Sequence, residues 1–433
     1  MTRARADRRD EAARLLGQLI ACDTSNPPGC ETRAAALLAD YLGSAGVACE
    51  LVAREPERAN LVARVTGGSG PTLMFLGHTD VVPADQHGWT VPPFGGIERD
   101  GAIWGRGAVD MKCQLASAAV ALAELARSGR KPGGDVLLVA AADEEVGDAN
   151  VGMPWLVEQR PEIRPDFAVG EGAGERFDVP TGPVYLVDRG VKQGVQVTMR
   201  VRGRAGDASL PGSGEDALST LAGLLARLPG FVGEPRLGPE AEGIAAAVAP
   251  GSGKPDERLE RVRAANGSLG RILEALMRTT VVPTQARAAG PFNVVADVAE
   301  ATLQCGLLPE DDVEDLLDQI RRELGEERYE LEPGEPNGGS RSPIESPLRD
   351  AIDGFVAEHD PAARTVATLG YGYSDCHVLR EAFGTVAYGF IPFRHAPPEQ
   401  NLQGKHGPDE HVLIDDLEFQ VGGALHIARH LSD

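Results

Sequence analysis

Leu73-Met-Phe-Leu-Gly-His-Thr-Asp80 is a short apolar run that ends in a His-x-Asp pair. The four apolar residues at its start are typical of a buried strand. Open α/β sheets carry their chemistry at the carboxyl ends of their strands, and this run would deliver His78 and Asp80 there. A single His-x-Asp pair is a weak signal, so its meaning depends on the rest of the chain.

Two further apolar runs also end in acidic residues. Residues 134–142 lead into Glu144 and Glu145, and residues 166–170 lead into Glu171. These runs alternate with segments of helical periodicity, such as the Ala- and Leu-rich stretch that follows Asp110. The alternation predicts the α/β class, with a mainly parallel sheet flanked by helices.

The length of 433 residues predicts two domains, because one hydrophobic core rarely keeps growing at that size. Near residue 190 the pattern changes to the strict alternation of residues 194–202, which predicts an antiparallel strand. A Pro- and Gly-rich linker follows at residues 333–340. We therefore expect residues 190–335 to form a smaller α+β domain inserted into a domain made of residues 1–189 and 336–433.

The composition excludes several classes of partner. Lys and Arg number 42 against 65 Asp and Glu, which gives a net charge of −23 and argues against binding to nucleic acid or an anionic membrane. No apolar run is long enough to span a bilayer, and the charged N-terminal segment does not resemble a signal peptide. The six cysteines are scattered, which predicts reduced thiols. We expect a cytoplasmic protein with a small-molecule substrate.

A late histidine, His406, completes a set of two imidazoles and three carboxylates without cysteine. Such a set suits Zn²⁺, with Co²⁺ or Mn²⁺ possible, and one bridging carboxylate would make a pair of metals. Five residues have the required types: His78, Asp110, Glu145, Glu171 and His406. Glu144 would then be free to act as a general base. Asp80 could accept the other ring N–H of His78 and so orient it.

Each acidic residue also has a simpler explanation. Taken singly, Asp110 or Glu171 is more readily an exposed loop residue or a helix N-cap. The adjacent Glu144 and Glu145 are harder to explain in this way, because two neighbouring carboxylates repel unless a cation or a proton is present.

Four blocks of sequence resemble one family of metallopeptidases, that of aminoacylase, acetylornithine deacetylase, succinyl-diaminopimelate desuccinylase and carboxypeptidase G. The blocks occur in the family's order along nearly the whole chain: Gly77-His-Thr-Asp-Val-Val-Pro83, Gly105-Arg-Gly-Ala-Val-Asp-Met-Lys112, Ala142-Asp-Glu-Glu-Val-Gly147 and Lys405-His-Gly407. The resemblance implies a di-zinc catalytic domain interrupted by a lid or dimerisation domain, and hence a homodimer formed through that lid.

The resemblance also implies a role for each candidate residue. One metal would be held by His78, Asp110 and Glu171, and the second by Asp110, Glu145 and His406. Glu144 would be the general base, and Asp80 would orient the histidine.

The chain departs from the family's pattern in the segments that contact substrate. Asp207 stands where the family usually has a His that stabilises the oxyanion across the dimer, and Gly306 stands where an Arg usually grips the substrate carboxylate. His377 replaces a common Arg, whereas Asn293 is retained. We keep Asp207, Asn293 and His377 as candidate substrate contacts.

The expected activity is hydrolysis of an amide bond in an N-acyl amino acid, a dipeptide or a related small amide. Either other residues compensate for Asp207 and Gly306, or the substrate lacks a free carboxylate or carries a cationic group. A metal-bound protein without hydrolytic activity is the alternative from another class, and the retained Glu144 argues against it.

Overall fold

The computed structural model describes residues 3–325 and 328–431 and divides the chain into two compact units. Unit 1 comprises Met1–Gly190, Arg341–Gly370 and Ser374–Asp433, and unit 2 comprises Val191–Ser340 and Tyr371–Tyr373. The expected insertion, residues 190–335, falls almost entirely inside unit 2. The expected insertion starts one residue before the longer segment of unit 2, which begins at Val191. It ends five residues before that segment ends at Ser340.

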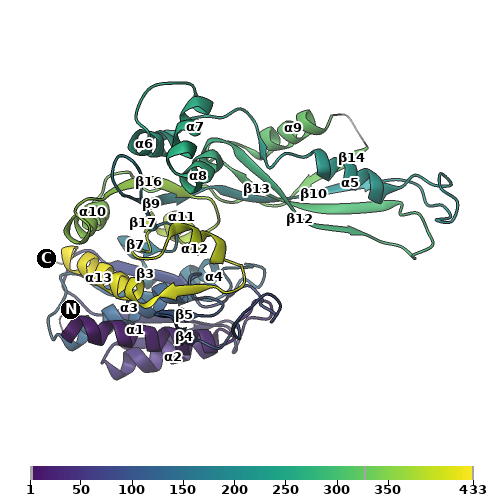
Figure 1. Cartoon of the computed structure of the whole chain (residues 1–433). Coiled ribbons are helices and arrows are strands. Elements are labelled where there is room, and N and C mark those ends of the chain that lie inside the picture. Colours follow the sequence, from purple (N-terminus) through teal and green to yellow (C-terminus); the bar gives the residue numbers. More distant parts are fainter. Residues whose placement is uncertain (1–2, 326–327, 432–433) are drawn as a thin grey trace. The chain divides into compact units, whose positions relative to one another are not determined.

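Within the described residues, unit 1 is built on a nine-stranded sheet (Figure 1). Its strands follow the order β1-β2-β6-β3-β7-β17-β9-β16, with β8 paired to β9. The neighbours β6, β3, β7 and β17 run parallel, whereas the pairs β1–β2, β2–β6 and β17–β9 are antiparallel. The expected α/β class is confirmed, as a mixed sheet with a parallel centre. The strands are Ala48–Ala53 (β1), Ala59–Val65 (β2), Leu73–His78 (β3), Val136–Ala141 (β6), Phe167–Gly170 (β7), Arg176–Phe177 (β8), Val184–Val191 (β9), Arg364–Gly370 (β16) and Val386–Gly389 (β17).

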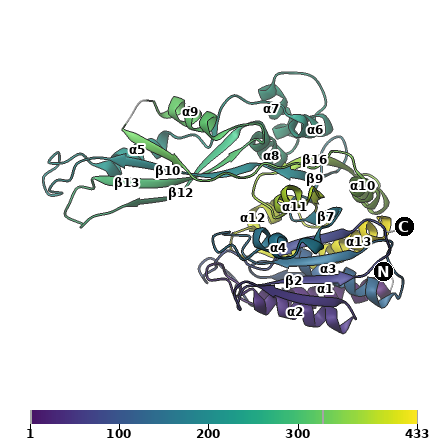
Figure 2. The ribbon, with the colours of Figure 1, turned by 180° about the vertical axis from the view of Figure 1, so that it is seen from behind.

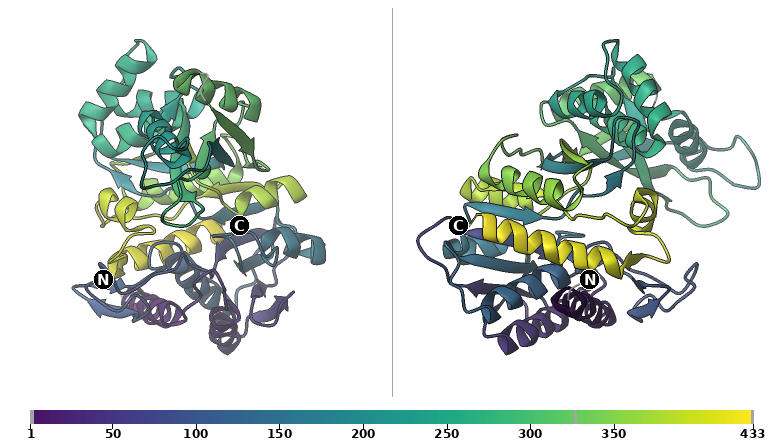
Figure 3. Two further views of the ribbon diagram at one scale, coloured as in Figure 1. Left: turned by 90° about the vertical axis from the view of Figure 1, so that its right-hand side faces the viewer. Right: turned by 60° about the vertical axis from the view of Figure 1, so that its left-hand side comes forward.

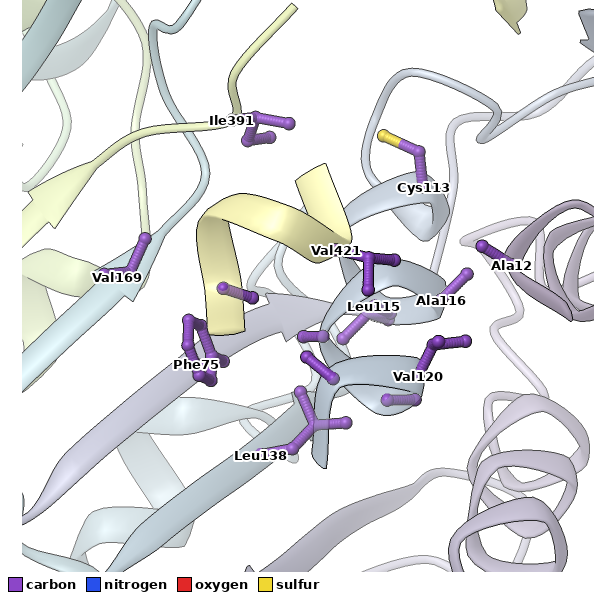
Figure 4. Close-up of a cluster of buried hydrophobic side chains, with 14 of the residues drawn as sticks. Ala12, Phe75, Cys113, Leu115, Ala116, Val120, Leu138, Val169, Ile391 and Val421 are labelled. Atoms are coloured by element: carbon purple, nitrogen blue, oxygen red, sulfur yellow. The ribbon is translucent and has the colours of Figure 1, made fainter. Parts of the chain in front are cut away.

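The opening run is continuously apolar because both of its faces are covered. Phe75 points into the larger hydrophobic cluster, together with Leu138 of the neighbouring β6 (Figure 4). Its neighbour Met74 points into a cluster on the other face, together with Leu137. Full burial of such a side chain contributes about 1.5–3 kcal/mol, so both faces stabilise the strand that carries His78.

Helices cover the sheet on both faces. The larger cluster includes residues of five helices, and α1, α3 and α13 contact one another there (Figure 1; Figure 3). The cluster on the opposite face includes residues of α4 and α11. The helices of the first set are Arg3–Ala21 (α1), Thr32–Ser44 (α2), Lys112–Arg127 (α3), Pro347–His359 (α10) and Ile414–His430 (α13), and those of the second are Met153–Gln159 (α4) and Cys376–Phe383 (α11).

In the described part of unit 2, a six-stranded sheet follows the order β11-β12-β13-β10-β14, with β15 paired to β10. The alternation at residues 194–202 correctly predicted β10, whose apolar side chains join those of α5 and α9 in one cluster. The ribbon of these elements is labelled in Figure 2. The elements are Phe231–Val232 (β11), Thr279–Ala288 (β12), Val298–Leu307 (β13), Gln193–Arg202 (β10), Tyr329–Pro333 (β14), Asn337–Gly338 (β15), Ala217–Arg227 (α5) and Val313–Leu324 (α9).

The sequence patterns assigned no element to residues 230–270, where the structure has the strand β11 and two short helices, and where a third short helix begins. The helices are Pro239–Val248 (α6), Pro255–Ala265 (α7) and Gly267–Met277 (α8). Their Gly- and Pro-rich borders suggest loops, and each helix is too short to establish a clear period by itself. They contact one another, so packing rather than local propensity explains them.

Among the described residues, no helix combines the length and the apolar character that crossing a bilayer requires.

Candidate metal centre

Three adjacent strands of unit 1 bring the candidate residues to one edge of the sheet. The strand β3 ends at His78, β6 leads into Glu144 and Glu145, and β7 leads into Glu171. Because β3 runs parallel to both neighbours, their carboxyl ends meet. Asp110 lies just before α3.

The five expected ligands form two groups that share Asp110. The first group is His78, Asp110 and Glu171, and the second is Asp110, Glu145 and His406; within each group the potential ligand atoms all lie within 4.8 Å of one another. His78 Nε2 is 3.4 Å from Asp110 Oδ1 and 3.6 Å from Glu171 Oε2. His406 Nε2 is 3.4 Å from Asp110 Oδ2 and 3.2 Å from Glu145 Oε2.

Two buried atoms of this site have electron pairs to offer. His78 Nδ1 donates to the main-chain carbonyl of Asp80 at 2.9 Å, so in the neutral imidazole Nε2 is the atom with the lone pair. Within the described part of the chain, neither His78 Nε2 nor Glu145 Oε1 has a hydrogen-bond partner. Imidazole and carboxylate ligands without thiolates suit zinc, manganese or cobalt. The residues present therefore fit a pair of divalent cations.

The electrostatics of the site reflect its concentration of carboxylates. Burial raises the pKa of Glu144 well above its ordinary value, and the charge of Glu171 raises it further. Burial alone would lower the pKa of His78, but the charge of Glu144 and the nearby carboxylates raise it well above its ordinary value. Hydrogen bonds with Asp110 and Glu145 raise the pKa of His406 to about 10. Such a cluster needs protons or cations to balance its charge.

Asp80 contacts the site in more ways than the sequence suggested. Its carbonyl oxygen accepts the hydrogen bond from His78 Nδ1, while its carboxylate Oδ1 lies 3.5 Å from the same nitrogen. The carboxylate also accepts the main-chain N–H of Glu144 at 3.1 Å and that of Glu145 at 3.1 Å. Asp80 thus links the end of β3 to the turn after β6.

Five buried residues near the site were missed by the sequence analysis: Asn26, Glu31, Arg58, Asp143 and Glu410. Asn26 precedes two prolines, a pattern that by itself predicts only a break in regular structure. Glu410 lies four residues after His406, and nothing in its local pattern distinguishes it from a solvent-exposed acid. Their hydrogen bonds join segments that are far apart in the chain.

The three candidate substrate contacts lie in different units. Asp207 and Asn293 are neighbours in unit 2, where the Ala208 N–H donates to the Asn293 carbonyl at 3.1 Å. Asp207 is exposed, and hydrogen bonds from the Ser209 hydroxyl and main chain lower the pKa of its carboxyl. His377 is half-buried in the first turn of α11 in unit 1, and burial lowers its pKa.

Two groups of histidine and carboxylate ligands that share Asp110, at one edge of an α/β sheet, define the class of metal-dependent hydrolases. Residues 74–430 match the model of peptidase family M20/M25/M40, and the chain belongs to that family. Its members are metal-dependent amidohydrolases, so the predicted family and enzyme class are confirmed.

Known relatives cover most of the chain. The succinyl-diaminopimelate desuccinylase of Methylobacterium radiotolerans is 31% identical over 430 residues, which is 94% of this chain and 94% of that protein. The N-fatty-acyl-amino acid synthase/hydrolase PM20D1 of Mus musculus is 27% identical over 380 residues, which is 82% of this chain and 73% of that protein.

Solved structures share the fold at lower identity. The M20 family metallo-carboxypeptidase Sso-CP2 from Sulfolobus solfataricus superposes with a TM-score of 0.73 at 19% identity, over 98% of this chain and 99% of its own. Human carnosine dipeptidase 1 also superposes with a TM-score of 0.73, at 16% identity, over 99% of this chain and 98% of that chain.

Proposed function

We propose that this enzyme hydrolyses the amide bond of a small N-acyl amino acid, dipeptide or related amide, with Glu144 as the general base. The observation that carries the proposal is the position of Glu144 beside the group of His78, Asp110 and Glu171. Its Oε2 lies 3.7 Å from His78 Nε2, yet it is needed in neither group. A buried carboxylate in that position can reach a water molecule that attacks the substrate carbonyl.

The two ligand groups would each hold one cation, which we propose to be zinc, with cobalt or manganese as alternatives. Such a pair would polarise the scissile carbonyl and lower the pKa of the attacking water. Glu144 accepts the proton of that water and then delivers it to the leaving nitrogen. Asp80 holds His78 through its carbonyl, and it holds Glu144 and Glu145 through their main-chain N–H groups.

The activities named for two relatives support an acylated amino compound as the substrate. They include a desuccinylase and an N-fatty-acyl-amino acid synthase/hydrolase. Hydrolysis of an amide between an acyl group and an amino acid is common to both names.

One observation favours a specialised substrate within that class. Asp207 is exposed and its pKa is lowered, so its carboxylate is ionised near neutral pH and cannot donate a hydrogen bond to an oxyanion. At Gly306 an added Cβ would meet Thr280 Oγ1 at 2.7 Å, so a larger side chain is not accommodated without movement. We therefore propose a substrate that lacks a free α-carboxylate or carries a cationic group.

We further propose that unit 2 forms a homodimer. In the described residues, β12 pairs with β13 from Thr280 to Ala288, with a register shift between Pro283 and Gln285, but its other edge pairs with β11 only at Thr279 and Thr280. Residues 282–288 of β12 are exposed. Exposed apolar side chains include Val282 on this strand and Leu218 on α5. An exposed strand edge with apolar neighbours is suited to pairing with a second copy.

The test is a metal assay combined with a panel of N-acyl amino acids, N-acyl amines and dipeptides. Glu144→Gln should retain both equivalents of metal but lose about a hundredfold or more in turnover, because the proton acceptor is gone. The matched control is Asp148→Asn, an exposed acid in the same segment, which should match the wild type. Full activity of Glu144→Gln refutes the mechanism. Bound metal with no turnover of any amide would instead favour a non-hydrolytic protein.

A further inference from the structure

The side-chain amide of Asn26 bridges two buried carboxylates next to the metal centre. Its Nδ2 donates to Asp80 Oδ2 at 2.9 Å and to Asp143 Oδ1 at 3.0 Å. Asn26 itself is only 3% exposed, and both carboxylates are buried. An amide nitrogen has two N–H groups, and here each one is used by a different acid.

Each of these acids holds a part of the candidate site. Asp80 binds His78 and accepts the main-chain N–H groups of Glu144 and Glu145. Asp143 immediately precedes Glu144 and has a positive φ of 60°, a conformation that is uncommon for a residue with a side chain. The turn that presents Glu144 is therefore fixed by hydrogen bonds and not by backbone preference.

A second set of contacts fixes Asp143 from the opposite side. Its Oδ2 accepts the main-chain N–H of Ala149 at 3.0 Å, and its Oδ1 lies 3.3 Å from Arg58 Nη2. Arg58 also donates to both carboxylate oxygens of Glu31, a residue with no exposed surface. Glu31 in turn accepts the Asp143 N–H at 3.3 Å. Asp143 is thus anchored, and Asn26 is the link from this anchor to Asp80.

We propose that Asn26 is a positioning residue for amide hydrolysis, which holds the Asp80 carboxylate against the turn that carries Glu144 and Glu145. The expected effect of Asn26 on turnover rests on the proposed function, whereas its expected effect on metal affinity does not. Without the amide, Asp80 and Asp143 would face each other as like charges in a buried setting, and both would lose a donor. The Asp80 carboxylate would then shift, and with it His78 and the two glutamates.

A purely structural role would be to attach the loop around Asn26 to the end of β3. The loop already has three other attachments there: the Asn26 main-chain N–H donates to the Val81 carbonyl at 2.9 Å, the Val81 N–H donates to the Thr24 carbonyl at 3.2 Å, and Thr24 Oγ1 donates to the Thr79 carbonyl at 2.6 Å. The side chain of Thr24 is therefore a matched control. It is buried in the same loop and bonds to the same strand end, but it does not touch a carboxylate of the site.

The experiment compares Asn26→Asp, Asn26→Ala and Thr24→Val in the full-length zinc-loaded enzyme. Asn26→Asp keeps the shape but replaces the donors by a third carboxylate, and Asn26→Ala removes the donors without adding charge. The readouts are kcat and KM for the best substrate of the panel, zinc affinity by competition with a chromogenic chelator, and the unfolding temperature of the metal-free protein.

Both Asn26 variants should lose about tenfold to a hundredfold in kcat with KM within about threefold, and should bind zinc about tenfold more weakly. Thr24→Val should lower the unfolding temperature while its kcat and zinc affinity stay within about twofold of the wild type. If Asn26→Asp does not fold, Asn26→Ala decides the outcome. The inference is overturned if the folded Asn26 variants match Thr24→Val in kcat and zinc affinity. A wild type that hydrolyses no amide would refute the proposed function instead, and the zinc affinities would still test the role of Asn26.

Discussion

The carboxylate of Glu410 accepts the main-chain N–H of Asp110 at 3.0 Å across 300 residues of sequence. The same carboxylate accepts the N–H groups of Gly107 and Val109 and a hydrogen bond of 2.6 Å from Arg106 Nη1. Glu410 has no exposed surface. A residue near the end of the chain thus fixes the loop that presents Asp110, the carboxylate shared by both ligand groups.

Replacing Glu410 by glutamine should destabilise the protein and weaken metal binding. The amide would have one acceptor oxygen for four donors, and its own N–H groups would face other N–H groups. Breaking such a buried pair costs about 3–5 kcal/mol, and Arg106 would be left without its partner carboxylate. The measurements are urea unfolding of the metal-free protein and metal content after dialysis. Glu381→Gln, on an exposed part of α11, should match the wild type in both. An unchanged metal content in Glu410→Gln would contradict this account.

Replacing His406 by alanine should remove one equivalent of metal and leave the other. His406 contributes to the second group alone, whereas Asp110 serves both. Turnover should fall by about a hundredfold or more, because the pair acts jointly on the carbonyl and the water. Elemental analysis measures the metal content. The control is His411→Ala, five residues later, whose ring stacks on Trp104 at 3.9 Å between centroids and belongs to neither group. Two retained equivalents in His406→Ala would remove it from the ligand set.

Replacing Asp207 by histidine should raise activity toward ordinary N-acyl amino acids. An imidazole can donate a hydrogen bond to an oxyanion, which an ionised carboxylate cannot, and a single such donor can contribute about a hundredfold in kcat. We expect a gain of about tenfold in kcat/KM, because the remaining substrate contacts are unchanged. Asp207→Asn separates the removal of charge from the addition of an imidazole. If neither variant changes the ranking of substrates in the panel, Asp207 does not select the substrate.

Lys192 in unit 2 should make stability depend on pH. Its side chain is buried and donates to the carbonyls of Ala275 at 2.7 Å and Arg278 at 3.0 Å, and burial lowers its pKa to about 7. The unfolded chain keeps an ordinary lysine pKa of about 10.4. Between these values the unfolded state binds more protons, so the free energy of unfolding rises with pH.

Relative to Lys192→Met, the wild type should therefore gain about 2 kcal/mol between pH 7 and pH 9. Below pH 7 the Lys192 amine is charged in both the folded and the unfolded state, so the free-energy cost of burying its charge no longer changes with pH. Urea unfolding followed by circular dichroism at several pH values measures the difference. Lys254→Met, at an exposed lysine of the same unit, should show no such change with pH relative to the wild type. If the difference in the free energy of unfolding between the wild type and Lys192→Met is the same at every pH, the buried amine does not titrate in this range.

Charged substitutions on the exposed edge of unit 2 should prevent dimer formation. Val282 is 51% exposed on β12 and Leu218 is 48% exposed on α5. An aspartate at either position would place an unpaired charge in an apolar interface, which is strongly unfavourable. Sedimentation equilibrium should show a dimer for the wild type and a monomer for Val282→Asp and Leu218→Asp. Ile344→Asp, at an equally exposed apolar residue of unit 1, should remain dimeric. A monomeric wild type would refute the dimer itself.

The sequence by itself determined the strands that carry the site. The run at residues 73–76 is apolar at every position because both faces of β3 are covered, and that property can be read locally. The positions of His78, Glu144 and Glu171 follow from it, since parallel strands bring their carboxyl ends to one edge. The short helices α6, α7 and α8 could not be predicted in the same way, because their mutual packing stabilises them more than their local pattern does.

Only the tertiary structure decided which residues hold that site in place. Asn26 and Asp143 are separated by 117 residues, and Glu410 and Asp110 by 300, yet each pair is joined by a direct hydrogen bond. A hydrogen bond depends on the distance and direction between two groups, and no local period records either for partners that far apart. Chain periodicity therefore placed the candidate residues at the ends of the parallel strands, whereas the folding of distant segments placed the residues that fix them.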